Sequence, residues 1–280
     1  MAIGASGMSA EARPVFGGLL ARWRKTRRMS QLGLALEAEI SSRHVSFIET
    51  GRARPSREMV LRLAQALDVP LRERNDLLLA AGFAPVHRET PLDAPEMAPM
   101  LAAVRVILGR HDPFGAVAMD RNWDIVMASA ASTALINDCR LPGTPVAEPL
   151  SLTKAPRPNM IRLTCHPDGF KRLLVNWAEI VADTLTRLAD EAARAGDPRR
   201  RALLDEVLAY PDVAAARAAA SVRAPPLMIP VTLRLPDGGT LALMSTIATL
   251  GTAEDITLRE LRIEAFYPID PAVEAEARAG

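Results

Sequence analysis

The sequence has 280 residues, 49% of them hydrophobic and 4% aromatic, with 34 basic and 33 acidic side chains. This composition is typical of a globular protein of one to three domains and excludes disordered and collagen-like chains. Two cysteines cannot cross-link a chain of this length, so Cys139 and Cys165 are expected to be reduced, buried thiols. Residues 1–88 carry 14 basic and 8 acidic side chains, whereas residues 89–280 carry 20 and 25. The two parts are therefore expected to meet different partners.

No apolar run reaches the ~18 residues that a membrane span needs. The start of the sequence also lacks a charged region followed by an apolar stretch, which a secretion signal would have. We therefore expect a cytoplasmic protein without a membrane partner.

Residues 16–54 predict three short amphipathic helices separated by helix breakers. Ser30 is a natural N-cap for the second helix, in which apolar side chains recur at helical spacing at Leu32, Ala35 and Leu36. Each helix is too short to be stable alone, so the three must pack on one another. A helix, a tight turn and another helix form a layout that reads DNA.

The third helix is expected to start at 40–41 with Ser41 or Ser42 as its N-cap, to bury Val45 and Ile48, and to end at Gly51. With its two apolar residues inward, helical phasing turns outward four side chains that could reach a major groove: Arg43, Ser46, Phe47 and Thr50.

The polar side chains of this segment predict two kinds of contact with DNA. Arg43 has the planar fork that matches guanine, and Ser46 and Thr50 can hydrogen-bond bases or phosphates. Gln31 can donate to a phosphate and hold the register. The candidate DNA-binding residues are Gln31, Ser41, Ser42, Arg43, Ser46, Phe47, Thr50, Arg52 and Arg54.

Some other residues of this segment can be interpreted either as DNA contacts or as structural residues. The basic run of the first helix either attracts the phosphate backbone or is only a solvated face; it comprises Arg22, Arg24, Lys25, Arg27 and Arg28. Glu49 would repel phosphates, so we expect it to pair with a first-helix arginine such as Arg24 or Arg28 and to clamp the helices together. Phe47 either packs against a partner or meets a thymine methyl group.

Taken together, these residues resemble the helix-turn-helix of the xenobiotic-response-element and phage-repressor type. That family typically reads LR..R...SQ..LA....S...S.IE.GR..PS. The matching residues are Leu20, Arg24, Arg28, Ser30, Gln31, Leu34, Ala35, Ser41, Ser46, Ile48, Glu49, Gly51, Arg52, Pro55 and Ser56. The resemblance implies a double-stranded DNA operator as partner.

Two more helices complete the first domain. The fourth begins at Ser56 and the fifth covers 73–81, closed by Gly82. The segment that follows is rich in proline and poorly periodic, which marks a boundary. We expect an all-α DNA-binding domain of five helices over 12–88, a linker over 89–99 and a second domain over 100–272.

The second domain is predicted to contain helices and strands in the order of a PAS-like fold. The expected helices cover 100–109, 130–139, 170–188, 199–209 and 212–220. The expected strands form a hairpin around the turn at 120–122, led on its second strand by Trp123, and continue over 227–235, 241–250 and 258–267. This order predicts an α+β domain with a five-stranded antiparallel sheet and helices on one face.

The runs NMIRLTCHPDGFKRLLVNWAEI and STIATLGTAEDITLRELRIEAFYPID resemble the ligand-binding domain of MmyB-like transcription regulators. The runs SRHVSFIETGRARPSREM and VPLRERNDLLLAAGFAP resemble the DNA-binding half of the same regulators, so the resemblance covers nearly all of residues 15–271. It implies a bacterial regulator whose PAS-like domain binds a small apolar, fatty-acid-like effector. No other cofactor is implied. The sequence departs from the family at Ser129, where an asparagine is usual.

The candidate ligand-binding residues are Phe114, Trp123, Met127, Arg162, His166, Leu174, Trp177 and Met244. Arg162 or His166 could hold a ligand carboxylate while Trp177 supplies apolar wall. Alternatively, residues 166–169 form only a turn, with Asp168 capping the next helix. The apolar candidates could equally be core residues.

Two other functions would fit parts of the sequence, an enzyme and a dimerisation or partner-binding module. Cys165, His166 and Asp168 are residue types used by nucleophilic enzymes, but their spacing points the side chains apart, and no metal-ligand motif is present. We therefore expect no enzyme and no catalytic or metal site. The second domain could instead be only a dimerisation or partner-binding module; Trp177 and Met244 lining a cavity would favour a sensor. A homodimer is expected from the geometry of paired half-sites.

Overall fold

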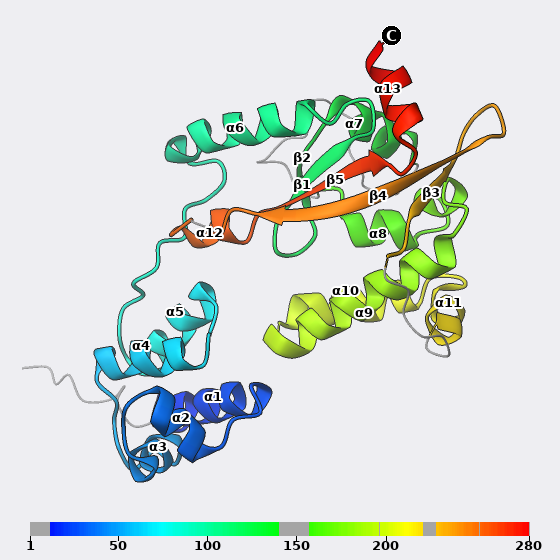
Figure 1. Cartoon of the computed structure of the whole chain (residues 1–280). Helices are drawn as coiled ribbons and strands as arrows, with labels where there is room; N and C mark the ends of the chain where they lie inside the picture. Colours follow the sequence, from blue (N-terminus) through cyan, green and yellow to red (C-terminus); the bar gives the residue numbers. More distant parts are fainter. Residues whose placement is uncertain (1–11, 140–156, 196, 221–227, 252, 280) are drawn as a thin grey trace, which may run out of the picture. The chain divides into compact units, whose positions relative to one another are not determined.

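The computed structural model describes residues 12–139, 157–195, 197–220, 228–251 and 253–279. The chain divides into two compact units (Figure 1): residues 1–89 with 254–256, and residues 90–253 with 257–280.

The N-terminal unit contains five helices, α1 (Ala12–Thr26), α2 (Gln31–Glu37), α3 (Ser42–Glu49), α4 (Arg57–Ala66) and α5 (Leu71–Ala80). Serine side chains cap three of them. The hydroxyl oxygens of Ser30, Ser41 and Ser56 each accept a hydrogen bond from a backbone N–H three residues ahead, at 2.9, 3.1 and 3.1 Å. The predicted start of α3 is therefore confirmed, with Ser41 as the cap.

The core of this unit draws on every helix, including Leu20, Leu34, Ile48, Leu63 and Leu78. The pattern expected for the second helix is wrong at two positions, because Leu32 and Leu36 are 60% and 71% exposed. Leu34 and Ala35 are buried instead. A two-turn helix offers two apolar stripes at the same spacing, and periodicity alone does not say which stripe faces the core.

The second unit contains eight α-helices and five strands among its described residues. In chain order these elements, with two 3-10 turns, are η1 (Pro95–Met97), α6 (Ala98–Gly109), β1 (Ala116–Met119), β2 (Ile125–Ala128), α7 (Ala130–Asp138), α8 (Met160–Cys165), η2 (Phe170–Arg172), α9 (Trp177–Ala195), α10 (Pro198–Leu208), α11 (Val213–Ala220), β3 (Val231–Arg234), β4 (Thr240–Thr249), α12 (Ile256–Arg259), β5 (Arg262–Pro268) and α13 (Pro271–Ala279).

The five strands form one antiparallel sheet in the order β2-β1-β5-β4-β3. Strand β5 lies in the centre, where Glu264 is paired with Val117 of β1 and Ile247 of β4. The predicted α+β fold with a five-stranded antiparallel sheet is confirmed.

The expectation that helices cover one face of the sheet is wrong. One core contains Val117 and Met119 with side chains of α7, α8, α9, α10 and α11. A second core contains Ala116 and Ala118 with Leu101 and other side chains of α6, so this helix covers the opposite face (Figure 1). Because neighbouring residues of β1 point to opposite faces, both faces need a cover.

The helix predicted over 170–188 is also corrected. The structure has the short turn η2, then a turn segment with an isolated bridge between Leu174 and Leu233, and α9 begins only at Trp177. The backbone N–H of Val175 donates to Thr232 at 2.8 Å, and that of Arg234 donates to Leu173 at 2.8 Å. These residues keep helical spacing, but their backbone groups pair with β3 instead of continuing a helix.

Candidate functional site

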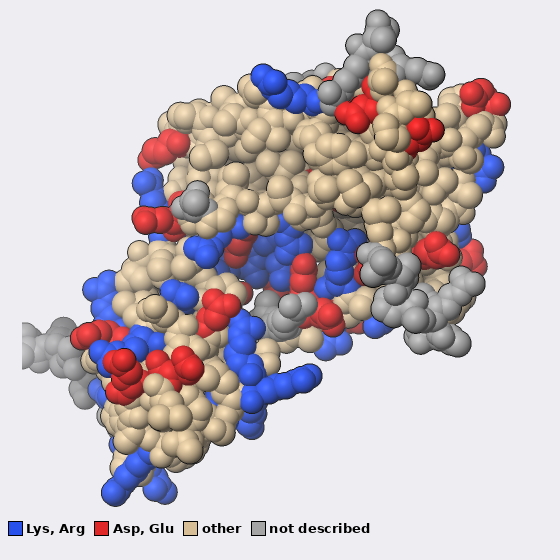
Figure 2. Space-filling model, viewed as in Figure 1, with Lys and Arg blue, Asp and Glu red and all other residues tan. Residues whose placement is uncertain are grey.

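The exposed face of α3 is the first candidate site. Val45 and Ile48 are buried and Arg43 is exposed, as the helical phasing predicts. The guanidinium of Arg43 lies 5.1 Å from the ring centre of Phe47, and that of Arg52 lies 6.0 Å from it. Figure 2 shows basic side chains projecting where Figure 1 places α3. Phe47 thus holds the guanidinium groups of Arg43 and Arg52 on the same surface.

The hydroxyl and amide candidates have internal partners as well. The Ser41 hydroxyl caps α3, and the Thr50 hydroxyl donates to the carbonyl of Ser46 at 2.7 Å, which leaves it able only to accept from DNA. Gln31 Nε2 donates to Glu49 Oε2 at 2.8 Å, so the phosphate contact expected of Gln31 has only the second amide hydrogen available. The side chains of Ser42 and Arg54 lie on the exposed surface.

Glu49 joins α3 to α1. Arg24 Nε donates to Glu49 Oε1 at 2.6 Å and Arg24 Nη2 donates to Oε2 at 2.9 Å. Burial alone would raise the pKa of Glu49, but the hydrogen bonds from Arg24 and Gln31 outweigh it, and the pKa is lowered. The expected clamp is confirmed, with Arg24 as its partner.

The basic run expected on the first helix is divided in the structure, and its last two members lie beyond the end of α1 at Thr26. Arg24 is held by Glu49, and Arg27 donates to the backbone carbonyls of Leu67 and Asp68 at 2.8 and 2.6 Å. These two arginines stabilise the fold. The exposed members of the run are Arg22, Lys25 and Arg28.

A cavity of about 350 Å³ lies in the second unit, between the sheet and helices α7, α8 and α9. Its wall is mostly apolar and includes three of the predicted ligand residues, Phe114, Trp123 and Leu174. Such a volume is at the lower end of the range of small-molecule pockets, roughly 300–1,000 Å³.

Two predicted ligand residues lie on the other face of the sheet. Met127 packs in the core under α6. Met244 is paired with Tyr267, while Leu243 and Ser245 on either side of it line the cavity. The expectation for these two residues is wrong because alternate residues of a strand point to opposite faces.

Three further candidates do not line the cavity. Their side chains contact other residues beside it. Arg162 donates to both carboxylate oxygens of Glu206 at 2.7 Å. His166 packs edge-on against Tyr210, with ring centres 5.1 Å apart. The Nε1 of Trp177 donates to the carbonyl of Thr164 at 2.8 Å. The idea that Arg162 or His166 holds a ligand carboxylate beside Trp177 is therefore corrected.

Ser129 has a structural role. Its buried hydroxyl oxygen accepts hydrogen bonds from the backbone N–H groups of Ala116, at 3.1 Å, and Ser132, at 3.4 Å. It caps α7 and ties that helix to β1.

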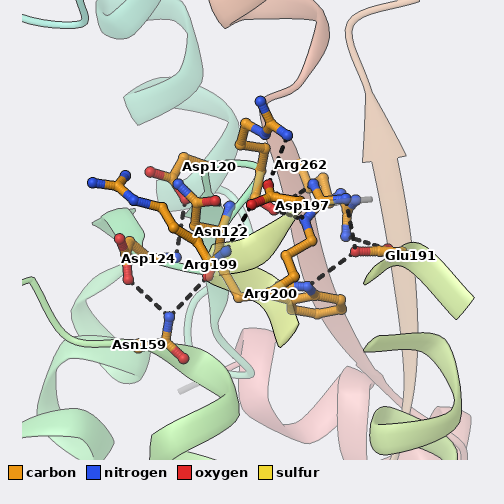
Figure 3. Close-up of polar contacts among 11 residues, drawn as sticks. Asp120, Asn122, Asp124, Asn159, Glu191, Asp197, Arg199, Arg200 and Arg262 are labelled. Atoms are coloured by element: carbon orange, nitrogen blue, oxygen red, sulfur yellow. Dashed lines mark hydrogen bonds and ion pairs between the residues drawn. The ribbon is translucent and has the colours of Figure 1, made fainter. Parts of the chain in front are cut away.

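A polar network joins α9, α10, the hairpin turn and β5 (Figure 3). Glu191 pairs with Arg262 at 2.8 Å and with Arg200 at 3.9 Å, while Asp197 pairs with Arg121 at 2.8 Å and with Arg200 at 3.9 Å. Three guanidinium groups thus share two carboxylates, and burial is the largest reason that the pKa of Arg200 is lowered. We call Arg121, Arg200 and Arg262 the guanidinium cluster.

Trp123 separates this network from the cavity. Its Nε1 donates to Glu191 at 3.2 Å, and the guanidinium groups of Arg262 and Arg187 lie 5.0 and 5.9 Å from its ring centre. The residue has φ 66°, a left-handed conformation that side-chained residues rarely adopt. It therefore lies in the turn and does not lead β2 as predicted, and the strain marks it as a candidate functional position.

Of the three residues of nucleophilic type, His166 and Asp168 lie close together, with Nδ1 and Oδ2 3.8 Å apart, so the expectation that the side chains point apart is wrong for this pair. Burial raises the pKa of Cys165 to about 12, so this thiol stays protonated at neutral pH. Within the described parts of the chain, no cluster of His, Cys, Asp or Glu could hold a metal ion. No helix in those parts is both long and apolar enough to cross a membrane.

Residues 101–279 match the family described as the MmyB-like transcription regulator ligand binding domain, and residues 15–77 match a helix-turn-helix domain. The chain belongs to the MmyB-like transcription regulators. A regulator's ligand-binding domain and a helix-turn-helix domain in one chain support a DNA-binding regulator. The chain matches no curated protein.

Two solved structures resemble part of this MmyB-like regulator. The restriction-modification controller protein C.AhdI from Aeromonas hydrophila is 32% identical, with 24% of this chain and 98% of that chain covered and a TM-score of 0.22. The clp gene regulator ClgR from C. glutamicum is 24% identical, with 26% and 92% covered and a TM-score of 0.23.

Sequence reasoning missed the polar end of the cavity. Arg187, Ser245 and Glu264 line it together, from α9, β4 and β5. One signal was available: Glu264 is an acid in the interior of a strand, between the apolar residues Ile263 and Ala265, at a position that faces a covered side of the sheet.

Proposed function

We propose that this MmyB-like regulator reads a specific DNA operator with α3 and that a small apolar, fatty-acid-like effector binds in the cavity of its second unit. The regulator would act in the cytoplasm as a homodimer on an inverted repeat. Paired helices that enter successive major grooves motivate the dimer.

The observation that carries the proposal is the apolar cavity of about 350 Å³ in a chain that also holds a helix-turn-helix. Phe114, Trp123 and Leu174 supply wall from three separate segments, so a ligand would touch the segment before β1, the hairpin turn and the region before α9 together. A ligand shifts an equilibrium only by its difference in affinity for the two states. Contacts to several elements are a source of that difference.

On the DNA side, the argument rests on Arg43. Its guanidinium is exposed near the N-terminus of α3, where recognition helices contact base edges. Stacking on Phe47 limits its rotation, which reduces the entropy lost when it forms a paired contact with guanine.

Native mass spectrometry of the purified full chain, followed by denaturing extraction, tests the effector half of the proposal. We expect a co-purified apolar molecule that is lost in Leu174→Trp, which places an indole on the cavity wall. Leu79→Trp is the matched control, because Leu79 is 56% exposed in the other unit. A clean apoprotein that also fails to bind added apolar compounds would favour the alternative, a dimerisation or partner-binding module.

A further inference from the structure

Helix α6 is apolar on nearly every side, yet only one of its faces is buried. Its inner side chains pack against β1, β2 and β5, and its single charged residue is Arg105. On the outer side Val106 is 59% exposed, and Met100 and Ile107 are exposed as well. Where Figure 1 places α6, Figure 2 shows a surface with few charged side chains. Because a helix that is apolar all round is normally buried all round, the outer side calls for a cover.

The sheet face under α6 is also covered only in part. Ile263 and Ala265 of β5 are buried there, whereas the β4 residues paired with them, Ala248 and Thr246, are exposed. Directly paired residues lie on the same face of a sheet, so these two residues face the same side as α6. Met244, two residues earlier on β4, is exposed on that side too. We call Met244, Thr246 and Ala248 the open strip of β4; none of them is charged.

The exposed residues of α6 form an apolar stripe with opposite charges at its two ends. Asp93 and Glu96 precede the helix, Arg110 follows it, and all three are exposed. Arg105 points about 160° away from Ala103 and lies off the stripe. The apolar members of the stripe, which lie within about 60° of Ala103 at about 100° per residue, are Pro99, Met100, Ala103, Val106 and Ile107.

The spacing of these residues makes the stripe complementary to itself. Residues 96 and 110 are equally far from Ala103 along the chain, and so are residues 100 and 106. In an antiparallel pair with Ala103 on the two-fold axis, Met100 of each copy meets Val106 of the other, and the acidic end meets the basic end. A parallel pair would set acid against acid and base against base, which is unfavourable. The small side chain at the axis lets the two helices approach to about 8–10 Å.

The charges of the stripe favour a second copy over other partners. DNA is anionic and would meet an uncharged surface with two acids at one end. Helices that lie on a membrane carry many basic residues on their polar face, whereas α6 contains only Arg105.

We infer that α6 and the open strip of β4 bind the same surfaces of a second copy of this chain, with the two α6 helices antiparallel across a two-fold axis at Ala103. This interface is that of the homodimer in the proposed function, so it rests on that part alone and requires neither effector nor operator. A specific interface buries about 800 Å² on each partner. Helix α6 is about 18 Å long and about 10 Å wide, so the open strip of β4 is needed as well.

Sedimentation equilibrium of the full chain, without DNA or added ligand, measures the dissociation constant of the dimer. We expect wild type to be dimeric at about 10 µM. Ala103→Glu sets two carboxylates against each other at the axis and should weaken the dimer by about a hundredfold or more, while glutamate preserves the helix. Ala215→Glu is the matched control, because Ala215 is exposed on α11, which belongs to the core on the opposite face of the sheet. It should leave the constant within about threefold of wild type.

Reversing the charges at the ends of the stripe tests the antiparallel direction. Glu96→Arg and Arg110→Glu should each weaken the dimer by about tenfold, because like charges then meet at both ends. The double variant brings opposite charges together again and should return the constant to within about threefold of wild type. A parallel pair, or a dimer through another surface, gives no such recovery.

Cysteine cross-linking locates the two-fold axis. In the antiparallel pair the Cα atoms of the two Ala103 residues lie about 4–5 Å apart, which a disulfide can span. Ala103→Cys should therefore give a covalent dimer under mild oxidation, whereas Ala102→Cys, turned by about 100° from the axis, should not. The native thiols of Cys139 and Cys165 are buried and do not interfere.

The outcomes separate this interface from the proposed function. If wild type is monomeric at about 100 µM, the proposed homodimer and this interface both fail, while operator and effector binding keep their own tests. If wild type is dimeric but Ala103→Glu and the charge reversals behave like Ala215→Glu, the homodimer stands and the assignment to α6 is overturned. A double variant that stays as weak as the single ones overturns the antiparallel register. Circular dichroism verifies that each variant is folded.

Discussion

Removing the Glu49 clamp should strongly destabilise the N-terminal unit. The side chains of Arg24 and Glu49 are only 12% and 7% exposed, and two hydrogen bonds at 2.6 and 2.9 Å join them. Losing one partner of a buried pair costs about 3–5 kcal/mol. Arg24 keeps one hydrogen bond, to the carbonyl of Met29 at 2.9 Å, so we expect about 2–4 kcal/mol for Glu49→Ala.

For a unit of this size, that loss corresponds to a melting temperature lower by roughly 10–25 °C. Hydrogen exchange of peptides from α1 and α3, recorded on the full chain in a urea series, measures the stability of this unit alone. Glu58→Ala is the control, because Glu58 and its partner Arg62 are 84% and 43% exposed and 3.5 Å apart. That pair should contribute less than about 0.5 kcal/mol. If Glu49→Ala and Glu58→Ala lower the stability of this unit by equally small amounts, Glu49 does not clamp α3 to α1.

The same clamp predicts an acid sensitivity. The pKa of Glu49 is lowered in the folded state, so its contribution is present above the unfolded value of about 4.3 and is lost as pH falls through the folded value. The difference in stability between wild type and Glu49→Ala should therefore shrink as pH falls below the unfolded pKa and through the lower folded pKa. A difference that persists undiminished at acid pH would contradict the charge-based role.

Three further predictions concern other positions. Gly17→Ala should destabilise by about 1–3 kcal/mol, because a Cβ there would lie 2.3 Å from the Glu49 carbonyl, whereas Gly18→Ala meets no described atom within 4 Å and should stabilise α1 by up to about 1 kcal/mol; thermal melts compare them. Arg43→Ala should weaken operator binding by about 1–3 kcal/mol and relax the preference at one base pair, and an equal loss on every sequence would make Arg43 a phosphate contact. Gln31→Ala should weaken binding with little change in sequence preference, measured by competition with mutated duplexes.

The helix-turn-helix was predictable from sequence because its signals are local. Serine caps at Ser30, Ser41 and Ser56 fix where helices begin, and the spacing of Val45 and Ile48 sets the inward face of α3. Glu49 was also predictable, since a carboxylate on a DNA-facing segment would repel phosphates and the basic first helix offers it a partner. Here residue types and short spacings carry the information.

The cavity was less predictable because its wall is assembled from distant segments. The residues at 173–176 keep helical spacing but pair with β3, and only the tertiary fold decides between the two. Arg162 has the chemistry to hold a ligand carboxylate, yet its guanidinium donates to the carboxylate of Glu206, which lies 44 residues later in the chain. Met244 has the right character but the wrong strand parity, which depends on a register that sequence does not give.

The most direct test of the account is whether a cavity ligand changes operator affinity. The operator would be selected from a random duplex library with the full chain, and its affinity measured by fluorescence anisotropy at fixed salt, with and without the co-purified molecule or dodecanoate. We predict a severalfold change that disappears in Leu174→Trp. An operator affinity that stays constant while calorimetry shows the cavity filled would contradict the claim that this MmyB-like regulator is controlled by its ligand.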